Sequence, residues 1–351
     1  MFAVLKRTID NPTPSRTFSS RWLLFTVVMF GLVNAPAVRA QDAAPPIKDP
    51  YTEQHTKFAP GVVTVIPPAP HPEETIDGPL AMNEFLQAYP ELAWDPAKFK
   101  DGTPNFDPRT RTLVEMAKQV VLRREIYCLE FSFKPLRQIY ADVPMPGGRV
   151  QRKLIWYMVY RVRYRGGDLR PAADQVAGSS LYTRVESVAY QSRRFFPLIT
   201  LSDHVSGTEY VDRIIPSATS VIAAREQITA PLYNTVEITR HPVPHSTDAD
   251  APGVWGVVTW TDVNPHIDFL SLSVSGLTNA FQVDGEASDA PYRRKMLKLN
   301  FYRPGDAMDQ IRDNIRFGMP AHRDAKEESY ILNKYDMQEA LKYEWTYRLV
   351  N

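Results

Sequence analysis

The chain has 351 residues, of which 44% are hydrophobic, 23% charged and 11% aromatic. This composition supports a folded core and excludes a wholly disordered chain, a collagen-like chain and a protein with many membrane spans. A formal net charge of +1 gives no broad attraction to nucleic acid, and a single cysteine excludes a disulfide framework and a cysteine-based zinc site.

Residues 1–40 have the pattern of a secretory signal peptide. Basic residues precede an apolar stretch at 22–33, and Val38-Arg39-Ala40 places small side chains at positions −3 and −1 of a cleavage site before Gln41. The apolar stretch is shorter than the roughly 20 residues that cross a bilayer. We therefore expect a periplasmic or secreted protein whose signal is cleaved near Ala40 and which has no transmembrane span afterwards. An uncleaved anchor is the alternative.

Cleavage would make the protein slightly acidic. The first forty residues hold five basic residues and one acid, so the remaining chain carries 36 basic and 39 acidic residues, a net charge of −3. We therefore expect no nucleic-acid partner, because binding to a phosphate backbone depends on excess positive charge.

Residues 41–105 are predicted to form a proline-rich spacer with little regular structure. Nine of the 30 prolines fall within 41–79, and each one fixes a backbone angle and removes a hydrogen-bond donor. Residues 61–66 could add one edge strand, and a short helix is possible at 82–89. The next predicted helix, 107–123, has Asp107 as its N-cap and Pro108 in its first turn.

Beyond this helix the hydrophobic period changes from that of a helix to that of a strand. Alternating residues at 127–133 share one face. The segment 149–165 is the clearest strand, since tyrosine and valine alternate with Arg161, Arg163 and Arg165. Its middle, residues 154–159, is apolar on both faces, which is typical of a strand covered on two sides.

The rest of the chain repeats short strand patterns separated by turn residues. Two short helices are predicted at 217–227 and 307–317. The expected strands are 194–201, 209–215, 232–239, 254–262, 269–275, 280–283, 296–302 and 343–349.

These patterns predict a mainly β fold of tandem, immunoglobulin-like β-sandwich units with a few short helices. The first β-rich unit would span 106–216 and the second 217–351. A faint internal repeat supports two units: residues 131–136 resemble 272–277, and Tyr164-Arg-Gly-Gly-Asp168 resembles Tyr302-Arg-Pro-Gly-Asp306. Chance similarity between two hairpins is the alternative.

Three stretches carry a resemblance to a group of exported proteins of planctomycete-type bacteria to which no activity is assigned. The stretches are Cys128–Leu136, Arg152–Arg163 and Trp255–Asp268, with further similarity at 269–281 and 299–306. The resemblance covers most of the chain from about residue 125 to 320. It implies export and a shared β-rich body, and it implies no catalytic residues.

Two clusters have residue types that bind metals. His241 and His245, followed by two aspartates, could bind zinc or copper, although the surrounding prolines also fit a solvated loop. Asp262, Asn264 and Asp268 could offer oxygens to calcium. Because Asp and Asn also satisfy backbone groups in turns, a turn is the favoured interpretation of this second cluster.

The row Arg161, Arg163 and Arg165 is the best-defined surface feature of the sequence. A ladder of cations on a sheet could bind a polyanion or an acidic partner protein. It could equally be a solvated sheet face paired with acids from neighbouring strands.

Known catalytic motifs are missing from the sequence. It contains no serine elbow, no His-Glu-x-x-His, no phosphate-binding loop and no dinucleotide fingerprint. We therefore predict a non-enzymatic binding or scaffolding module of the periplasm or cell envelope that uses no cofactor. The alternatives are a secreted hydrolase whose site forms only in the fold, and a protein that binds metal in a loop.

Overall fold

Two large β-sheets contain most of the described strands. The computed structural model describes residues 57–76, 123–173, 184–283, 291–304 and 315–349. Within them the fold is mainly β, with several sheets and few helices, which confirms the predicted fold class. Among the described residues, no helix combines the length and apolar character that a membrane crossing requires.

The first large sheet, the β4 sheet, is built around the long strand β4 (Val150–Arg163). Its order is β1–β2–β4–β12–β10, and β3 also pairs with β4. Strands β2 and β3 occupy successive halves of the same edge of β4, and β12 lies along the other edge. The predicted edge strand at 61–66 is confirmed as β1. The remaining bounds are β1 Thr64–Ile66, β2 Glu130–Phe133, β3 Arg137–Pro144, β10 Leu232–Tyr233 and β12 Val254–Thr261.

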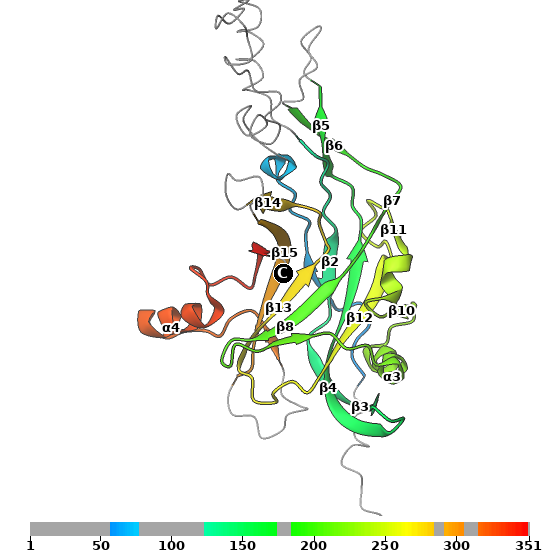
Figure 1. Ribbon diagram of the computed structural model, residues 1–351, viewed down its shortest axis with the longest axis vertical. Helices are drawn as coiled ribbons and strands as arrows, with labels where there is room; N and C mark the ends of the chain where they lie inside the picture. Colours follow the sequence, from blue (N-terminus) through cyan, green and yellow to red (C-terminus); the bar gives the residue numbers. More distant parts are fainter. Residues whose placement is uncertain (1–56, 77–122, 174–183, 284–290, 305–314, 350–351) are drawn as a thin grey trace, which may run out of the picture. The chain divides into compact units, whose positions relative to one another are not determined.

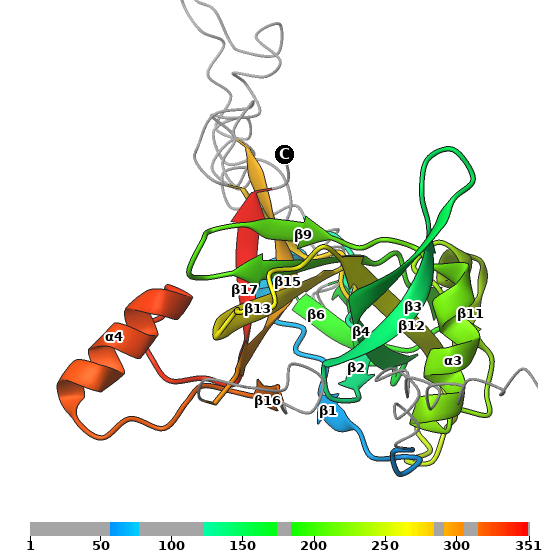
Figure 2. The same ribbon diagram turned by 90° about the horizontal axis from the view of Figure 1, so that it is seen from below.

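The second large sheet, the β13 sheet, has the order β14–β15–β13–β8–β9. Strands β16 and β17 pair with the edge of β15 that β13 leaves free. Figure 1 shows β14, β15, β13 and β8 of this sheet, and Figure 2 shows β9, β16 and β17. The bounds are β8 Leu198–Asp203, β9 Glu209–Val211, β13 Phe269–Ser275, β14 Phe281–Val283, β15 Tyr292–Tyr302, β16 Arg316–Phe317 and β17 Tyr343–Leu349.

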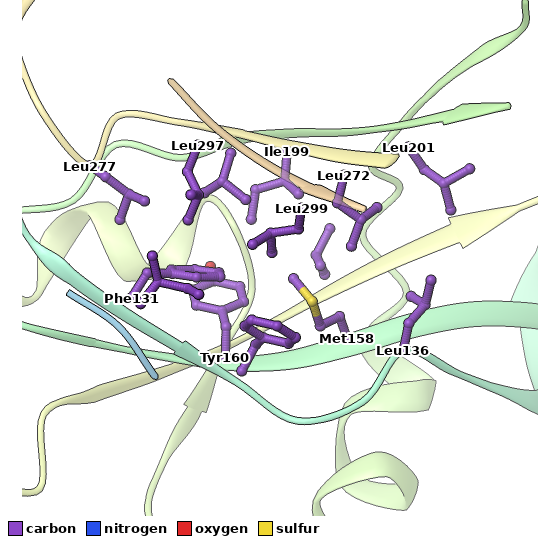
Figure 3. Packing of buried hydrophobic residues seen from close by; sticks show 14 of the residues in the cluster. Phe131, Leu136, Met158, Tyr160, Ile199, Leu201, Leu272, Leu277, Leu297 and Leu299 are labelled. Atoms are coloured by element: carbon purple, nitrogen blue, oxygen red, sulfur yellow. The ribbon is translucent and has the colours of Figure 1, made fainter. Parts of the chain in front are cut away.

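The two large sheets pack face to face, as in a sandwich. The alternation of each strand decides which side chains enter the core. Figure 3 shows aromatic and methionine side chains of the β4 sheet meeting leucines and isoleucines of the β13 sheet. The core residues include Phe131, Trp156, Met158, Tyr160 and Val162 on one side, and Ile199, Leu201, Leu270, Leu272, Leu297 and Leu299 on the other.

Helix α3 (Pro216–Glu226) covers the outer face of the β4 sheet. Tyr157 and Val159 of β4 face a second cluster in which α3 contributes Ala218 and Ile222. Figure 2 shows α3 beside β3 and β12 of this sheet. Both predictions made for this region are confirmed, because β4 is buried on its two faces and a helix begins near residue 217.

Helix α4 (Ala325–Tyr335) was not expected from the sequence. Asp324 caps it by accepting hydrogen bonds from the N–H groups of Lys326 and Glu327, both at 2.9 Å. Its Tyr330 and Tyr335 rings pack edge-on against Phe269 of β13. Tyr335 also donates its hydroxyl to Phe301 O and accepts a hydrogen bond from Lys298 Nζ at its carbonyl. The buried residues of the helix, Ile331 and Tyr335, are too few to give a clear helical period in the sequence.

Several other predicted elements differ from the structure. Residues 232–239 form the short strand β10 and then a 3-10 turn, η4 (Glu237–Arg240), because Asn234 Oδ1 accepts the N–H groups of Val236 and Glu237. The predicted helices at 82–89 and 107–123 lie outside the described residues. Of the predicted helix at 307–317 only the end is described, and it contains β16.

Smaller elements complete the described fold. Strand β5 (Asp168–Ala172) pairs with β6 (Arg184–Val188). Strand β7 (Ser192–Arg194) pairs with β11 (Pro242–Pro244), so the expected loop around His241 is partly a strand. Its two prolines fit a peripheral position because β7 is its one neighbour among the described strands. A 3-10 turn, η1, spans Pro72–Thr75.

The two predicted β-rich stretches share both large sheets. Strand β4, from the first stretch, pairs with β12 from the second, and β8 from the first pairs with β13 from the second. The boundary between residues 216 and 217 therefore does not separate one sheet from the other.

Candidate anion-binding site

The predicted arginine row lies on the α3 side of the β4 sheet, at the end of β4 away from the helix. Arg161 and Arg163 belong to β4, and Arg165 follows it. Strand β2 places Glu130 opposite Arg163 and Ser132 opposite Arg161. Strand β12 places Trp255 opposite Arg161 on the other edge. The register of three strands thus collects three guanidinium groups, one carboxylate and one indole.

The guanidinium groups of Arg163 and Arg165 form hydrogen bonds with other residues of the chain. Glu130 accepts a hydrogen bond from each: Arg163 Nε lies 2.5 Å from Oε1 and Arg165 Nε lies 3.0 Å from Oε2. Their remaining donors reach backbone carbonyls of the loop after β11, with Arg163 Nη1 at 2.6 Å from Ala249 O and Arg165 Nη1 at 3.1 Å from Ser246 O. These two side chains fasten that loop to the sheet.

Arg161 differs from its two neighbours because no described residue hydrogen-bonds or ion-pairs with its guanidinium. Its Cζ lies 5.3 Å from the centre of the Trp255 ring. The Nε atom is buried and has no hydrogen-bond partner in the described part of the chain, and the same holds for the hydroxyl of Ser132 on the neighbouring strand. Since Arg161 remains partly exposed, it offers unused donors at the surface beside a buried hydroxyl.

The electrostatics of this cluster favour a negative ligand. Burial lowers the pKa of Arg161, and the nearby positive charges of Arg163 and Arg165 lower it further, against the opposing effect of Glu130. An arginine stays protonated under these conditions, so its charge lacks full compensation. A bound anion, such as a carboxylate, sulfate or phosphate, would raise the pKa of Arg161 again and accept hydrogen bonds from its guanidinium.

The loop that frames the cluster is closely packed. Gly253 has a φ of +63°, and a Cβ added there would lie 2.7 Å from Arg163 Cγ and 3.0 Å from Arg161 Cγ. A larger residue would push the loop away from both stems. The glycine therefore sets the distance between the loop and the arginine row.

The two histidines of the predicted metal site do not converge. His241 stacks on Tyr233, with 3.8 Å between ring centres, whereas His245 packs edge-on against Tyr164 at 5.5 Å. The extended strand β11 between them separates the two positions by about 13 Å. Across the described residues no group of three or more His, Cys, Asp or Glu side chains is arranged to hold a metal ion.

The predicted calcium candidates form a turn. Asp262 has a positive φ and pairs with Lys153 at 2.7 Å, and Asn264 Oδ1 accepts the N–H of His266 at 3.0 Å. These contacts are those of a turn stabilised by its own side chains, as the favoured interpretation predicts.

A serine and a histidine meet on the outer face of the β13 sheet, where a hydrolase would need them. His204 Nε2 lies 2.7 Å from Ser271 Oγ, and Ser271 donates to Asn300 Oδ1 at 2.7 Å. Asn300 Nδ2 donates to Leu341 O, which fixes Oδ1 as the acceptor. The single serine proton therefore points at Asn300, and His204 must donate to Ser271 instead of accepting from it.

The Ser271 hydroxyl is also inaccessible, since this residue is only 1% exposed. Burial is the largest cause that lowers the pKa of His204, to about 4, and Lys298 adds to it. The imidazole is therefore neutral at physiological pH. The pair is a buried hydrogen-bond network and lacks the arrangement of a serine nucleophile with its base.

Three buried carboxylates outside the arginine row are held by cations. Glu226 binds Arg137 and Lys134, Glu74 binds Lys295, and Asp168 binds Arg193. Each of these carboxylates also accepts a tyrosine hydroxyl. Asp168 is thus part of an internal ion pair, and Asp306, its counterpart in the repeat, lies outside the described residues.

The lone cysteine forms no ion pair with a cation among the described residues. Cys128 is buried, and its burial raises the pKa of the thiol to about 11. This agrees with its predicted role as a small apolar side chain.

The sequence predicted Arg161 as part of a surface row, but it did not predict that Ser132 and Trp255 lie beside it. The alternation of 149–165 identified the row, but Ser132 and Trp255 lie 29 positions before it and 94 positions after it, and only strand pairing brings them together. A recess beside Asp212, Thr235 and Thr259 has room for little more than one water molecule. No family model matches the chain, and no curated protein or solved structure is significantly similar to it.

Proposed function

We propose that this chain is an exported, non-enzymatic binding module of the periplasm or cell envelope that recognises an anionic group through Arg161. The observation that carries the proposal is the contrast within one row. Arg163 and Arg165 both pair with Glu130, while among the described residues nothing hydrogen-bonds to Arg161 or to the nearby Ser132 hydroxyl. A buried donor without a partner costs free energy unless a ligand supplies one.

Trp255 suggests the kind of ligand that would fit best. The indole beside Arg161 offers a flat apolar surface next to a cation. Acidic polysaccharides and acidic protein segments both present carboxylates or sulfates next to apolar surface. Export is supported by the signal-like pattern of residues 1–40. The buried carboxylates of Glu226, Glu74 and Asp168 are held by cations of the chain itself.

The proposal is tested by binding measurements with three polyanions: polygalacturonate, dextran sulfate and polyphosphate. Calorimetric titration at low salt is expected to give binding by the natural chain, with affinity falling as salt rises. The substitution Arg161→Met keeps the aliphatic stem and removes the charge, and it should weaken binding about tenfold or more because charge-assisted hydrogen bonds contribute about 1.5–3 kcal/mol.

Arg149→Met is the matched control, because Arg149 is an exposed arginine in the turn before β4. It removes the same charge at a distance from the site and should change the affinity less than twofold. If both variants lost the same amount of affinity, the loss would come from the change in net charge and not from the site. A natural chain that binds none of the three polyanions would refute the proposal.

A further inference from the structure

Strand β17 leaves one of its edges open in the described part of the chain. It pairs with β15 along Tyr343–Leu349, and no other described strand pairs with it. An open edge of this length is able to add a further strand. We propose that two copies of this chain associate through antiparallel pairing of their β17 strands across a two-fold axis. This inference does not depend on the anion-binding proposal.

The backbone shows which residues face the open edge. Asn300 donates its N–H to Lys342 O at 2.9 Å, just before β17 begins, and the register continues with Lys298 opposite Glu344 and Met296 opposite Thr346. Backbone groups of successive residues point to opposite sides of a strand. The even-numbered residues therefore bond to β15. The N–H and C=O groups of Tyr343, Trp345, Tyr347 and Leu349 point towards the open edge.

The side chains of β17 are self-complementary in one antiparallel register. If Thr346 faces Thr346 of the second copy, then Glu344 faces Arg348 of that copy, and Arg348 faces its Glu344. On the other side of the strand Trp345 faces Tyr347 of the second copy. Opposite charges and aromatic pairs placed directly across an antiparallel ladder both stabilise it.

In neighbouring registers Glu344 and Arg348 no longer face each other. A register centred on Trp345 places Arg348 opposite Lys342 of the second copy, so two cations face each other. A register centred on Tyr347 places Arg348 opposite Thr346 and leaves Glu344 without a cation. The symmetric arrangement around Thr346 is the one that pairs both charges. It also places the odd-numbered residues, whose backbone groups are free, directly opposite one another.

Contacts within one copy already hold the two charged side chains on the outer face of the β13 sheet. Glu344 Oε1 lies 3.1 Å from Lys298 Nζ. Arg348 Nη2 lies 3.1 Å from Glu209 Oε1, and about half of its side chain is exposed. Lys298, Ser273 and Glu209 all lie on the β15 side of β17, so both charged side chains must turn towards the open edge when a second copy binds. Because one added strand is small beside a standard protein interface, we expect a dimer that forms reversibly with concentration.

The first test uses a symmetric cross-link in the full chain. Thr346 would sit on the two-fold axis at a position where antiparallel strands bring Cα atoms to about 4.5 Å, which suits a disulfide. Mild oxidation of Thr346→Cys should therefore give a covalent dimer on a non-reducing gel. Thr200→Cys is the control, because Thr200 is partly exposed on β8 of the same sheet and away from β17. The native Cys128 is buried and should not react.

The second test uses charge reversal and mixing. Arg348→Glu and Glu344→Arg each place like charges across the axis, so each variant alone should be monomeric in sedimentation equilibrium. A mixture of the two variants restores both opposite pairs and should form a heterodimer. Each substitution also breaks an ion pair within its own copy, with Lys298 or Glu209. Mixing does not restore those pairs, so any association gained on mixing comes from contacts between copies.

Two results would overturn the proposal. One is a natural chain that stays monomeric at several hundred micromolar, with equal cross-linking of the Thr346→Cys and Thr200→Cys variants. The other is a mixture of the charge-reversed variants that shows no more association than either variant alone. If a charge variant fails to fold by circular dichroism, the cross-linking comparison still decides.

Discussion

In the His204 network, one fixed acceptor determines the direction of three successive hydrogen bonds. Leu341 O fixes the amide of Asn300, Asn300 takes the proton of Ser271, and Ser271 must then accept from His204. A neutral imidazole satisfies this chain of donors. A protonated imidazole would have to enter a site that burial and Lys298 make unfavourable to a positive charge, while Asp203 compensates only in part.

We predict that His204 makes the fold less stable in mild acid. Its pKa is about 4 in the folded chain against an ordinary value of 6.5, so between these values the unfolded chain binds a proton that the folded chain does not. The free energy of unfolding should therefore fall as the pH drops from about 6.5 to about 4, and this contribution should level off below that. Allowing for the partial exposure of the ring, the loss is on the order of 2 kcal/mol.

Urea unfolding at several pH values checks this prediction. His204→Gln keeps a donor for Ser271 and removes the titration, so its stability should decrease less over the same pH interval. Carboxylates common to both proteins cancel in the comparison. Identical pH profiles for the two proteins would show that the His204 ring is not protected from protonation.

At the scale of elements, Glu226 joins helix α3, strand β4 and the segment before β1. Its carboxylate binds Arg137 at 2.7 Å and the hydroxyl of Tyr157 at 2.8 Å. Lys134 bonds to the Glu226 carbonyl and to Ala59 O. The carboxylate and Lys134 are both almost fully buried, so the pair positions the elements only while both charges are present.

We predict that Glu226→Gln destabilises the fold by about 3–5 kcal/mol, because it leaves Lys134 and Arg137 beside a neutral amide in a buried position. Glu186→Gln is the control. Glu186 pairs with Arg170 at the surface, and loss of an exposed pair should change the free energy of unfolding only slightly. Thermal and denaturant unfolding measure both. Equal effects of the two substitutions would contradict the buried role of Glu226.

Individual elements differ in how well the sequence specifies them. The expected strands at 269–275 and 343–349 have the observed bounds, since each alternates cleanly between apolar and polar residues. Helix α4 was missed because most of its residues are polar or charged and only Ile331 and Tyr335 of its described side chains are buried, which is too few for a recognisable helical period. Strand β11 was missed because two of its three residues are prolines.

At the scale of the whole molecule, the sandwich is built by interleaving distant segments. The β4 sheet needs β12, and the β13 sheet needs β8, so neither predicted β-rich stretch contains a complete sheet. We therefore predict that fragments 106–216 and 217–351 are each unfolded when made alone. Each fragment would expose apolar residues of the shared core, such as Met158 and Leu272.

Circular dichroism and one-dimensional proton NMR of the separate fragments check this prediction, and co-expression should recover dispersed spectra. The uncut chain under the same conditions is the control. A well-dispersed spectrum from either fragment alone would show that one stretch folds independently after all.

The sequence by itself determined the mainly β class, several strands and the arginine row, because alternation along a strand is a local property that each segment carries. The tertiary structure alone decided which arginine is unpaired, where His241 and His245 lie, and how the two β-rich stretches share their sheets. These features depend on strand pairing between segments tens of residues apart. Pairing is set by the packing of a common core, which the pattern within one segment does not encode.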